Sequence, residues 1–109
     1  MREILLVITN LPDAPSAAEL AQQLIEARVA ACVSQLAPCT STYRWHGSIE
    51  TATEVPLLIK TTRAAYPRLE QLIRESHPYE LPEIIAVPVT AGLPAYLGWV
   101  NQETGIIPE

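Results

Sequence analysis

The sequence has little positive charge and few glycines, and each shortage argues against a class of function. Its seven lysines and arginines are scattered and its net charge is −5. We therefore do not expect nucleic acid as a partner, because nucleic-acid binding depends on neutralising phosphates. Only four glycines are present, and none lies in a phosphate-binding G-x-G-x-x-G or G-x-x-x-x-G-K-S/T pattern. No apolar run approaches the ~20 residues that a membrane helix needs, so direct membrane insertion is not expected.

Cysteine is equally scarce. Cys32 and Cys39 form neither a C-x-x-C pair nor a disulfide framework. The apolar segment around Cys32 suggests a buried, inert thiol, whereas the turn-like A-P-C-T-S-T segment places Cys39 nearer the surface. The sequence also lacks H-E-x-x-H and G-x-S-x-G motifs, and nothing local links a serine to a histidine. We therefore do not expect an enzyme.

Length and the first residues set two further expectations. A chain of 109 residues fits one domain, spanning residues 1–109. The segment M-R-E-I-L-L-V-I-T-N is too short for a secretory signal and lacks a small-residue cleavage site. A cytoplasmic location is the default expectation.

Strand-like and helix-like patterns alternate along the chain. Residues 3–9 form a β-branched apolar run, which is typical of a buried strand. Ser16 and Glu19 match a capping box, and apolar residues follow at helical spacing, which predicts a helix over about 16–29. A second helix is expected from Pro67, which suits a first helical position, to His77.

The region between these helices predicts an unusually long hairpin. Two strands meet at a His46-Gly47 turn, and each arm would run ~12–15 residues, about two to three times the usual strand. Pro56 conflicts with a central strand, and a bulge would resolve the conflict. A two-stranded ribbon is not stable alone in water, so the length of the arms indicates a partner subunit.

The remaining elements complete a known order. A third apolar strand follows the second helix, and Pro88 suits an edge position in it, because proline cannot donate to a ladder. A short helix begins near Pro94. The tail 103–109 is either a pairing extension or loosely ordered. The order β-α-β-β-α-β with a closing helix predicts an α+β, ferredoxin-like fold.

Candidate ligands are present without a chelating spacing. Thiolate and imidazole suit copper or zinc, but a site would have to be assembled by the fold or by contact between subunits. His77 either binds a metal or simply closes a helix, and His46 at the hairpin tip fits a solvated turn residue. Lys60, the only lysine, shares strand parity with Glu54, so both either flank a polar cleft or lie solvated on one face.

Several motifs together resemble the CutA family of divalent-cation tolerance proteins. They are A-A-C-V, S/T-x-Y-x-W-x-G-x-I-E, E-V-x-L-x-I-K-T, H-P-Y-E-x-P-E-I and Y-L-x-W, and they span essentially the whole chain. The resemblance implies a ferredoxin-like subunit in a homotrimer, with an architecture similar to that of the PII signalling proteins. It also implies a protein of divalent-cation tolerance that binds metal ions weakly or between subunits, with copper the expected ion and no essential cofactor.

The resemblance also assigns residues. It implies metal contacts at His77, Cys32, Glu80 and Glu83, an inter-subunit cleft lined by Glu54, Lys60 and Tyr79, and trimer packing through Tyr43, Trp45 and Trp99. Some copper-binding relatives carry a further histidine and cysteine where this chain has Ser76 and Ile8-Thr9. Two alternatives stay open. One is a sensor of a small anionic metabolite, held by Lys60 and Arg63, and the other is a structural protein that presents a surface to a partner.

Overall fold

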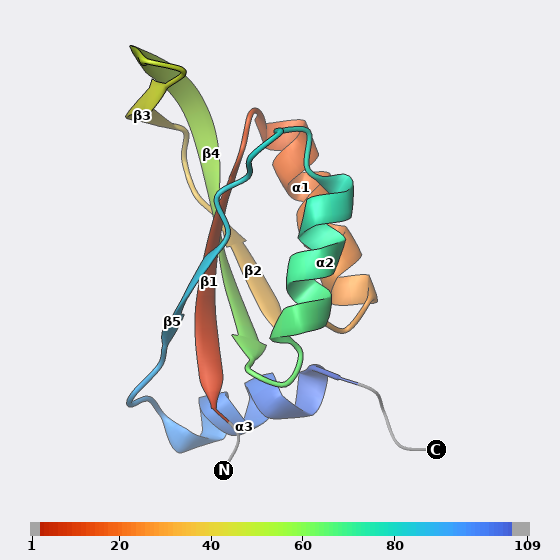
Figure 1. Ribbon diagram of the computed structural model, residues 1–109. Helices are drawn as coiled ribbons and strands as arrows, with labels where there is room; N and C mark the ends of the chain where they lie inside the picture. Colours follow the sequence, from red (N-terminus) through yellow and green to blue (C-terminus); the bar gives the residue numbers. More distant parts are fainter. Residues whose placement is uncertain (1–2, 106–109) are drawn as a thin grey trace.

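The computed structural model describes residues 3–105, which form one antiparallel sheet with three helices (Figure 1). The strands are β1 (Ile4–Leu11), β2 (Cys32–Gln35), β3 (Cys39–Trp45), β4 (Ser48–Thr62) and β5 (Ile85–Pro88). The helices are α1 (Ala14–Glu26), α2 (Tyr66–Ser76) and α3 (Pro94–Glu103). The sheet order is β2-β4-β1-β5, and in it β2 and β1 pair with residues 55–62 of β4. β3 pairs with residues 48–54 of β4. This arrangement confirms the α+β, ferredoxin-like prediction.

The start of α1 differs from the prediction. Asp13, not Ser16, is the N-cap: its carboxylate accepts a hydrogen bond from the backbone nitrogen of Ser16 at 2.8 Å. Pro15 lies in the first turn, where its missing N–H costs nothing, so the helix begins before Ser16. The helix ends at Glu26 and not near residue 29, because Arg28 adopts a positive φ of 59°.

Pro56 is accommodated without the predicted bulge. The pairing of β4 with β1 runs unbroken through Asn10 and Pro56. The carbonyl of Pro56 accepts from the backbone nitrogen of Leu36 at 2.9 Å, so the nitrogen of Pro56 also faces the β2–β3 side. Residues 36–38 belong to no strand. The side of Pro56 that lacks an N–H donor therefore faces residues 36–38, where the neighbouring strand is interrupted.

The long hairpin is present, but only one of its arms is continuous. β4 runs for 15 residues, while residues 36–38 divide the other arm into β2 and β3. The turn is the predicted one, with φ of 50° at His46 and 83° at Gly47, as a two-residue hairpin turn requires. Figure 1 shows β3 and the start of β4 projecting beyond the helices, and the molecule measures 49 × 28 × 23 Å.

The core lies between the sheet and helices α1 and α2. Alternate residues of β1 and β4 point into it, which is the period expected of strands with one face against helices. Its fully buried side chains include Val7, Leu24, Leu57, Ile59, Leu69 and Ile73.

The opposite face of the sheet is apolar but less covered. Ile85 and Val87 of β5 are 51% and 46% exposed, beside half-buried Leu6 and Ile8 of β1. β5 is an edge strand, as Pro88 predicted. Residues 106–109, part of the tail discussed above, lie outside the described residues. None of the helices within residues 3–105 combines the length and hydropathy needed to cross a membrane.

Candidate functional site

His77 ends α2 and fixes the segment that follows it. It is the C-cap residue, with extended backbone angles, as expected before Pro78. Its ring is buried and lies against the end of β1, where Nε2 is 2.7 Å from the backbone carbonyl of Asn10. The backbone nitrogen of Tyr79 donates to Nδ1 at 3.1 Å. Because a carbonyl can only accept and an N–H can only donate, His77 is neutral with its hydrogen on Nε2.

Tyr79 lies beside His77 and reaches Glu54. The two rings are 4.7 Å apart, tilted by 48°. Burial, followed by the charge of the Glu54 carboxylate and its hydrogen bond with the phenol, raises the pKa of Tyr79 to about 12. The phenol is therefore protonated at neutral pH and donates to Glu54. Of the three predicted cleft residues, the fold brings Glu54 and Tyr79 together.

The same corner holds Glu83 but not Glu80. The side-chain nitrogen of Asn10 donates to Glu83 Oε1 at 3.0 Å, which ties the loop after α2 to the end of β1. Glu80 is exposed and lines a separate groove along α2. Burial lowers the pKa of His77, while the Asn10 carbonyl and the charge of Glu54 act in the opposite direction. The corner thus combines a neutral imidazole with two carboxylates and a phenol.

Lys60 lies in a second cluster, on the outer face of the sheet. Its Nζ donates to Ser34 Oγ at 2.7 Å and lies 3.9 Å from Cys32 Sγ. Cys32 is half-buried in this chain, not buried as its apolar surroundings suggested. Burial and the nearby Cys32 raise the pKa of Tyr96, which places the α3 phenol at this cluster.

The predicted metal ligands do not converge within one chain. Cys32 and Lys60 are paired across β2 and β4, and Lys60 is opposite Leu6 of β1. Asn10, which contacts His77, is four residues further along β1, roughly 13 Å away at strand rise. Within residues 3–105, no three or more His, Cys, Asp or Glu side chains form a group that could hold a metal ion.

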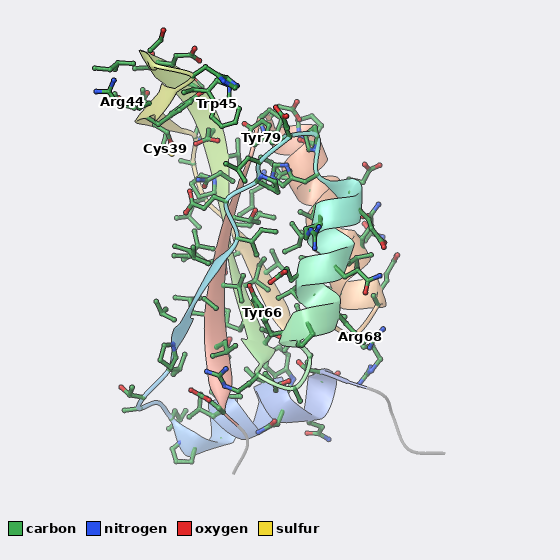
Figure 2. The ribbon with its side chains drawn as sticks, in the orientation of Figure 1. Cys39, Arg44, Trp45, Tyr66, Arg68 and Tyr79 are labelled. Atoms are coloured by element: carbon green, nitrogen blue, oxygen red, sulfur yellow. The ribbon has the colours of Figure 1, made fainter. Side chains whose placement is uncertain are left out.

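The aromatic residues predicted to pack a trimer lie at the surface. Tyr43 and Trp99 are each 40% exposed. Trp45 is half-buried near the tip of the long hairpin (Figure 2), and its ring lies 4.7 Å from that of His46. Trp99 lies 5.7 Å from Tyr96 on α3. These exposures leave the side chains available to a second copy.

Sequence reasoning missed two residues of these clusters. Asn10 contacts both His77 and Glu83, yet the predicted first strand ended at residue 9 and left Asn10 out. Ser34 is the nearest partner of Lys60, and its alternation with Cys32 along one strand was the available signal. Both contacts join segments that are far apart in sequence.

Comparison with known proteins identifies the family. The family model described as CutA1 divalent ion tolerance protein matches residues 5–103. The chain belongs to the CutA1 family. The divalent-cation tolerance protein CutA of Thermus thermophilus is 40% identical over 105 residues, which are 96% of this chain and 100% of that relative. This membership confirms the resemblance that the motifs indicated.

Other CutA relatives extend the comparison. Protein CutA of Mus musculus is 45% identical over 93 residues, which are 85% of this chain but 52% of the mouse protein, so the chain spans about half of that relative. The crystal structure of CutA from Xylella fastidiosa has a TM-score of 0.91 at 46% identity, covering 94% of this chain and 98% of that one. The crystal structure of CutA1 from Oryza sativa has a TM-score of 0.93 at 31% identity, and the match covers 95% of each chain.

Proposed function

We propose that this CutA1-family chain acts in divalent-cation tolerance as a homotrimer that binds copper weakly at sites between subunits. The observation that carries the proposal is the division of the candidate ligands into two clusters. Within residues 3–105 of one chain, neither the Cys32 cluster nor the His77 corner has a full ligand set. A second copy is the simplest source of the missing ligands.

The exposed surfaces support a trimer. On the outer face of the sheet, Ile85 and Val87 are about half exposed. In the projecting hairpin of β3 and the start of β4, Ile49 is 68% exposed. Burying such surface contributes roughly 25 cal/mol per Å² of apolar area, which offsets the entropic cost of association. A projecting two-stranded ribbon also needs a surface to lie on.

The chemistry of the ligands favours copper over magnesium. The Cys32 thiol and the His77 imidazole are soft or borderline donors, which copper and zinc prefer. His77 carries its hydrogen on Nε2, so only Nδ1 has a lone pair for a cation. Binding there displaces the backbone N–H of Tyr79, which now donates to that atom at 3.1 Å. This competition supports weak binding.

Calorimetric titration with Cu²⁺, Zn²⁺ and Mg²⁺ tests the proposal. We expect measurable heats with Cu²⁺ and Zn²⁺, smaller heats for Cys32→Ser and His77→Gln, and wild-type heats for the control Cys39→Ser, whose thiol lies on the exposed arm. Sedimentation on the same samples gives the mass of the assembly. Identical Cu²⁺ heats for all four proteins would show that neither Cys32 nor His77 binds the ion. A monomer at every concentration would contradict the trimer.

A sensor of small anions is the second candidate, and the position of Lys60 favours it. Its ammonium donates to the neutral Ser34 hydroxyl on a half-covered face, and within the described residues it is paired with no carboxylate. The predicted second cation, Arg63, is instead paired with Glu3. A thermal-shift panel of nucleotides and carboxylates distinguishes the candidates, because stabilisation by an anion that Lys60→Met abolishes supports the sensor. A cytoplasmic location is still a prediction, which cell fractionation tests.

A further inference from the structure

Cys32 and Lys60 lie opposite each other across two neighbouring strands. They are partners in the register of β2 and β4, and residues paired in this way project their side chains from the same face of a sheet. Lys60 Nζ lies 3.9 Å from Cys32 Sγ. The contact places an amine, which is a nucleophile, beside a sulfur that an oxidant makes electrophilic. The proposed copper binding uses the sulfur and gives the amine no role.

Ser34 and Tyr96 lie beside this contact. Ser34 Oγ accepts a hydrogen bond from Lys60 Nζ at 2.7 Å, which keeps the flexible lysine side chain near the sulfur. Tyr96 belongs to α3, the helix that crosses the end of the sheet where β4 stops (Figure 1). Burial raises the pKa of its phenol, and electrostatic and hydrogen-bond interactions with Cys32 add to this rise. The phenol is therefore a proton donor next to the sulfur.

Cys39, the second cysteine, is too distant to react with Cys32 of the same chain. Cys39 pairs with Glu54 of β4, whereas Cys32 pairs with Lys60. Positions 54 and 60 are separated by roughly 20 Å at strand rise. A disulfide requires Cα atoms within about 7 Å of each other. An oxidised Cys32 therefore meets the Lys60 amine and not a second thiol of its own chain.

We propose that Cys32 and Lys60 form a reversible oxidative crosslink, a sulfur–nitrogen bond that hydrogen peroxide produces. In the first step the Cys32 sulfur attacks one oxygen of the peroxide and the O–O bond breaks, which yields a sulfenic acid and water. The sulfur is oxidised and the peroxide is reduced. Cys32 is half-buried, so an oxidant little larger than water reaches its sulfur.

In the second step the Lys60 nitrogen displaces the oxygen from the sulfenic acid. The ammonium releases one proton to solvent, and the nitrogen lone pair then attacks the sulfur. The N–S bond forms as the S–O bond breaks, and the oxygen leaves as water with a second proton from the nitrogen, so no further oxidant is consumed. Sulfenic acids condense in this way with backbone nitrogens. The Tyr96 hydroxyl donates a hydrogen bond to the departing oxygen.

The crosslink goes beyond the proposed function and does not depend on it. The bond consumes the Cys32 thiol, so peroxide also removes this donor from any copper ion. A reducing dithiol reverses the reaction, because one thiol attacks the sulfur and releases the amine, and its second thiol then frees Cys32 by forming a disulfide. The Cys32 thiol thereby becomes available only under reducing conditions.

Peptide mapping of the peroxide-treated protein tests the proposal. Lys60 is the only lysine, and trypsin does not cut after it once its nitrogen is bonded to sulfur. We expect residues 29–44 joined to residues 45–63, with a mass two hydrogen atoms below the sum of the two peptides. Dithiothreitol should remove this species. A Cys32 that becomes only sulfenic acid, sulfinic acid or a disulfide would overturn the proposal.

Three variants identify the reacting atoms. Cys39→Ser is the matched control, because residues 29–44 contain both cysteines, and it should form the crosslink as the wild type does. Cys32→Ser should form none. Lys60→Arg keeps a positive charge but lacks the amine, so its Cys32 should stop at a sulfenic acid that dimedone traps. A crosslink in Lys60→Arg, or its loss in Cys39→Ser, would contradict the assignment.

Ser34→Ala and Tyr96→Phe test the two neighbouring residues. Each should slow crosslinking by about tenfold through lost positioning, while sulfenic acid, measured with dimedone, forms at the wild-type rate. Unchanged crosslinking rates would contradict these roles. Calorimetry with Cu²⁺ on the reduced protein separates the two proposals. A chain that crosslinks but binds no Cu²⁺ contradicts only the proposed function, and one that binds Cu²⁺ but never crosslinks contradicts only this inference.

Discussion

His77 joins the end of β1 to the loop after α2 through both of its ring nitrogens. Nε2 donates to the Asn10 carbonyl at 2.7 Å, and Nδ1 accepts from the Tyr79 backbone nitrogen at 3.1 Å. Both bonds require the neutral ring, because a protonated Nδ1 cannot accept. The relationship sets the position of Tyr79, and through it the contact with Glu54.

This relationship predicts a loss of stability on mild acidification. The unfolded chain takes up a proton at its histidines near pH 6.5. In the folded state burial lowers the pKa of His77, although the Asn10 carbonyl and Glu54 partly oppose this. The stabilisation from a neutral His77 is therefore complete above pH 6.5 and is lost as pH falls from there through the lower folded pKa.

Urea unfolding at a series of pH values checks this prediction. The wild-type free energy of unfolding should decline below about pH 6.5. His77→Gln retains an amide donor for the Asn10 carbonyl but cannot titrate, so it should be less stable at neutral pH and show a flatter profile in this window. Parallel profiles for the two proteins would contradict the assignment.

Asp13→Ala should destabilise the protein by about 1 kcal/mol, because it removes the acceptor for the first turn of α1. Thermal or urea unfolding measures the change. Ser16→Ala is the matched control. Ser16 is half-buried, and its hydroxyl donates a hydrogen bond to the Asp13 carbonyl at 3.2 Å but caps no backbone nitrogen, so we expect a smaller effect of about 0.5 kcal/mol. The reverse ranking would indicate a Ser16 cap.

Leu57 and Leu58 are adjacent leucines on opposite faces of β4. Leu57 is fully buried against the helices, so Leu57→Ala should cost roughly 2–5 kcal/mol at any protein concentration. Leu58 lies on the half-covered outer face. Leu58→Ala should mainly weaken assembly, so its cost should shrink on dilution. Unfolding followed at several concentrations separates the two effects, and a concentration-independent cost at Leu58 would contradict a trimer through this face.

Gly47 and Gly98 should respond in opposite directions to the same substitution. A Cβ at either position meets no atom within 4 Å, so packing does not differ. Gly47 has a φ of 83°, where alanine costs roughly 1–2 kcal/mol, whereas Gly98 lies within α3, where alanine gains about 0.5–1 kcal/mol. Thermal unfolding of Gly47→Ala and Gly98→Ala measures both. Stabilisation by Gly47→Ala would argue against the two-residue turn.

The predictions that held concern elements with strong local signals. The His46-Gly47 turn, the end of α2 at His77 and the edge position of Pro88 each follow from backbone restrictions of one or two residues. The predicted cap of α1 at Ser16 was wrong, because Asp13, three residues earlier, satisfies the same local rule. The structure selects Asp13, which lets Pro15 occupy the first turn.

The candidate site could be predicted only in part. The end of α2 at His77 was apparent from the sequence, but the anchor of the following segment on Asn10 was not. Strand parity correctly placed Glu54 and Lys60 on one face. It did not indicate that Tyr79 approaches Glu54, while Cys32 and Ser34 approach Lys60.

The sequence by itself determined the order of strands and helices, apart from the interruption at residues 36–38, and, through its motifs, the family, because periodicity, proline and glycine act over a few residues. Only the tertiary structure decided which side chains meet. Sheet register joins Cys32 to Lys60 across 28 positions, and helix packing joins His77 to Asn10 across 67. Such contacts depend on how separate elements pack, and no local pattern records that packing.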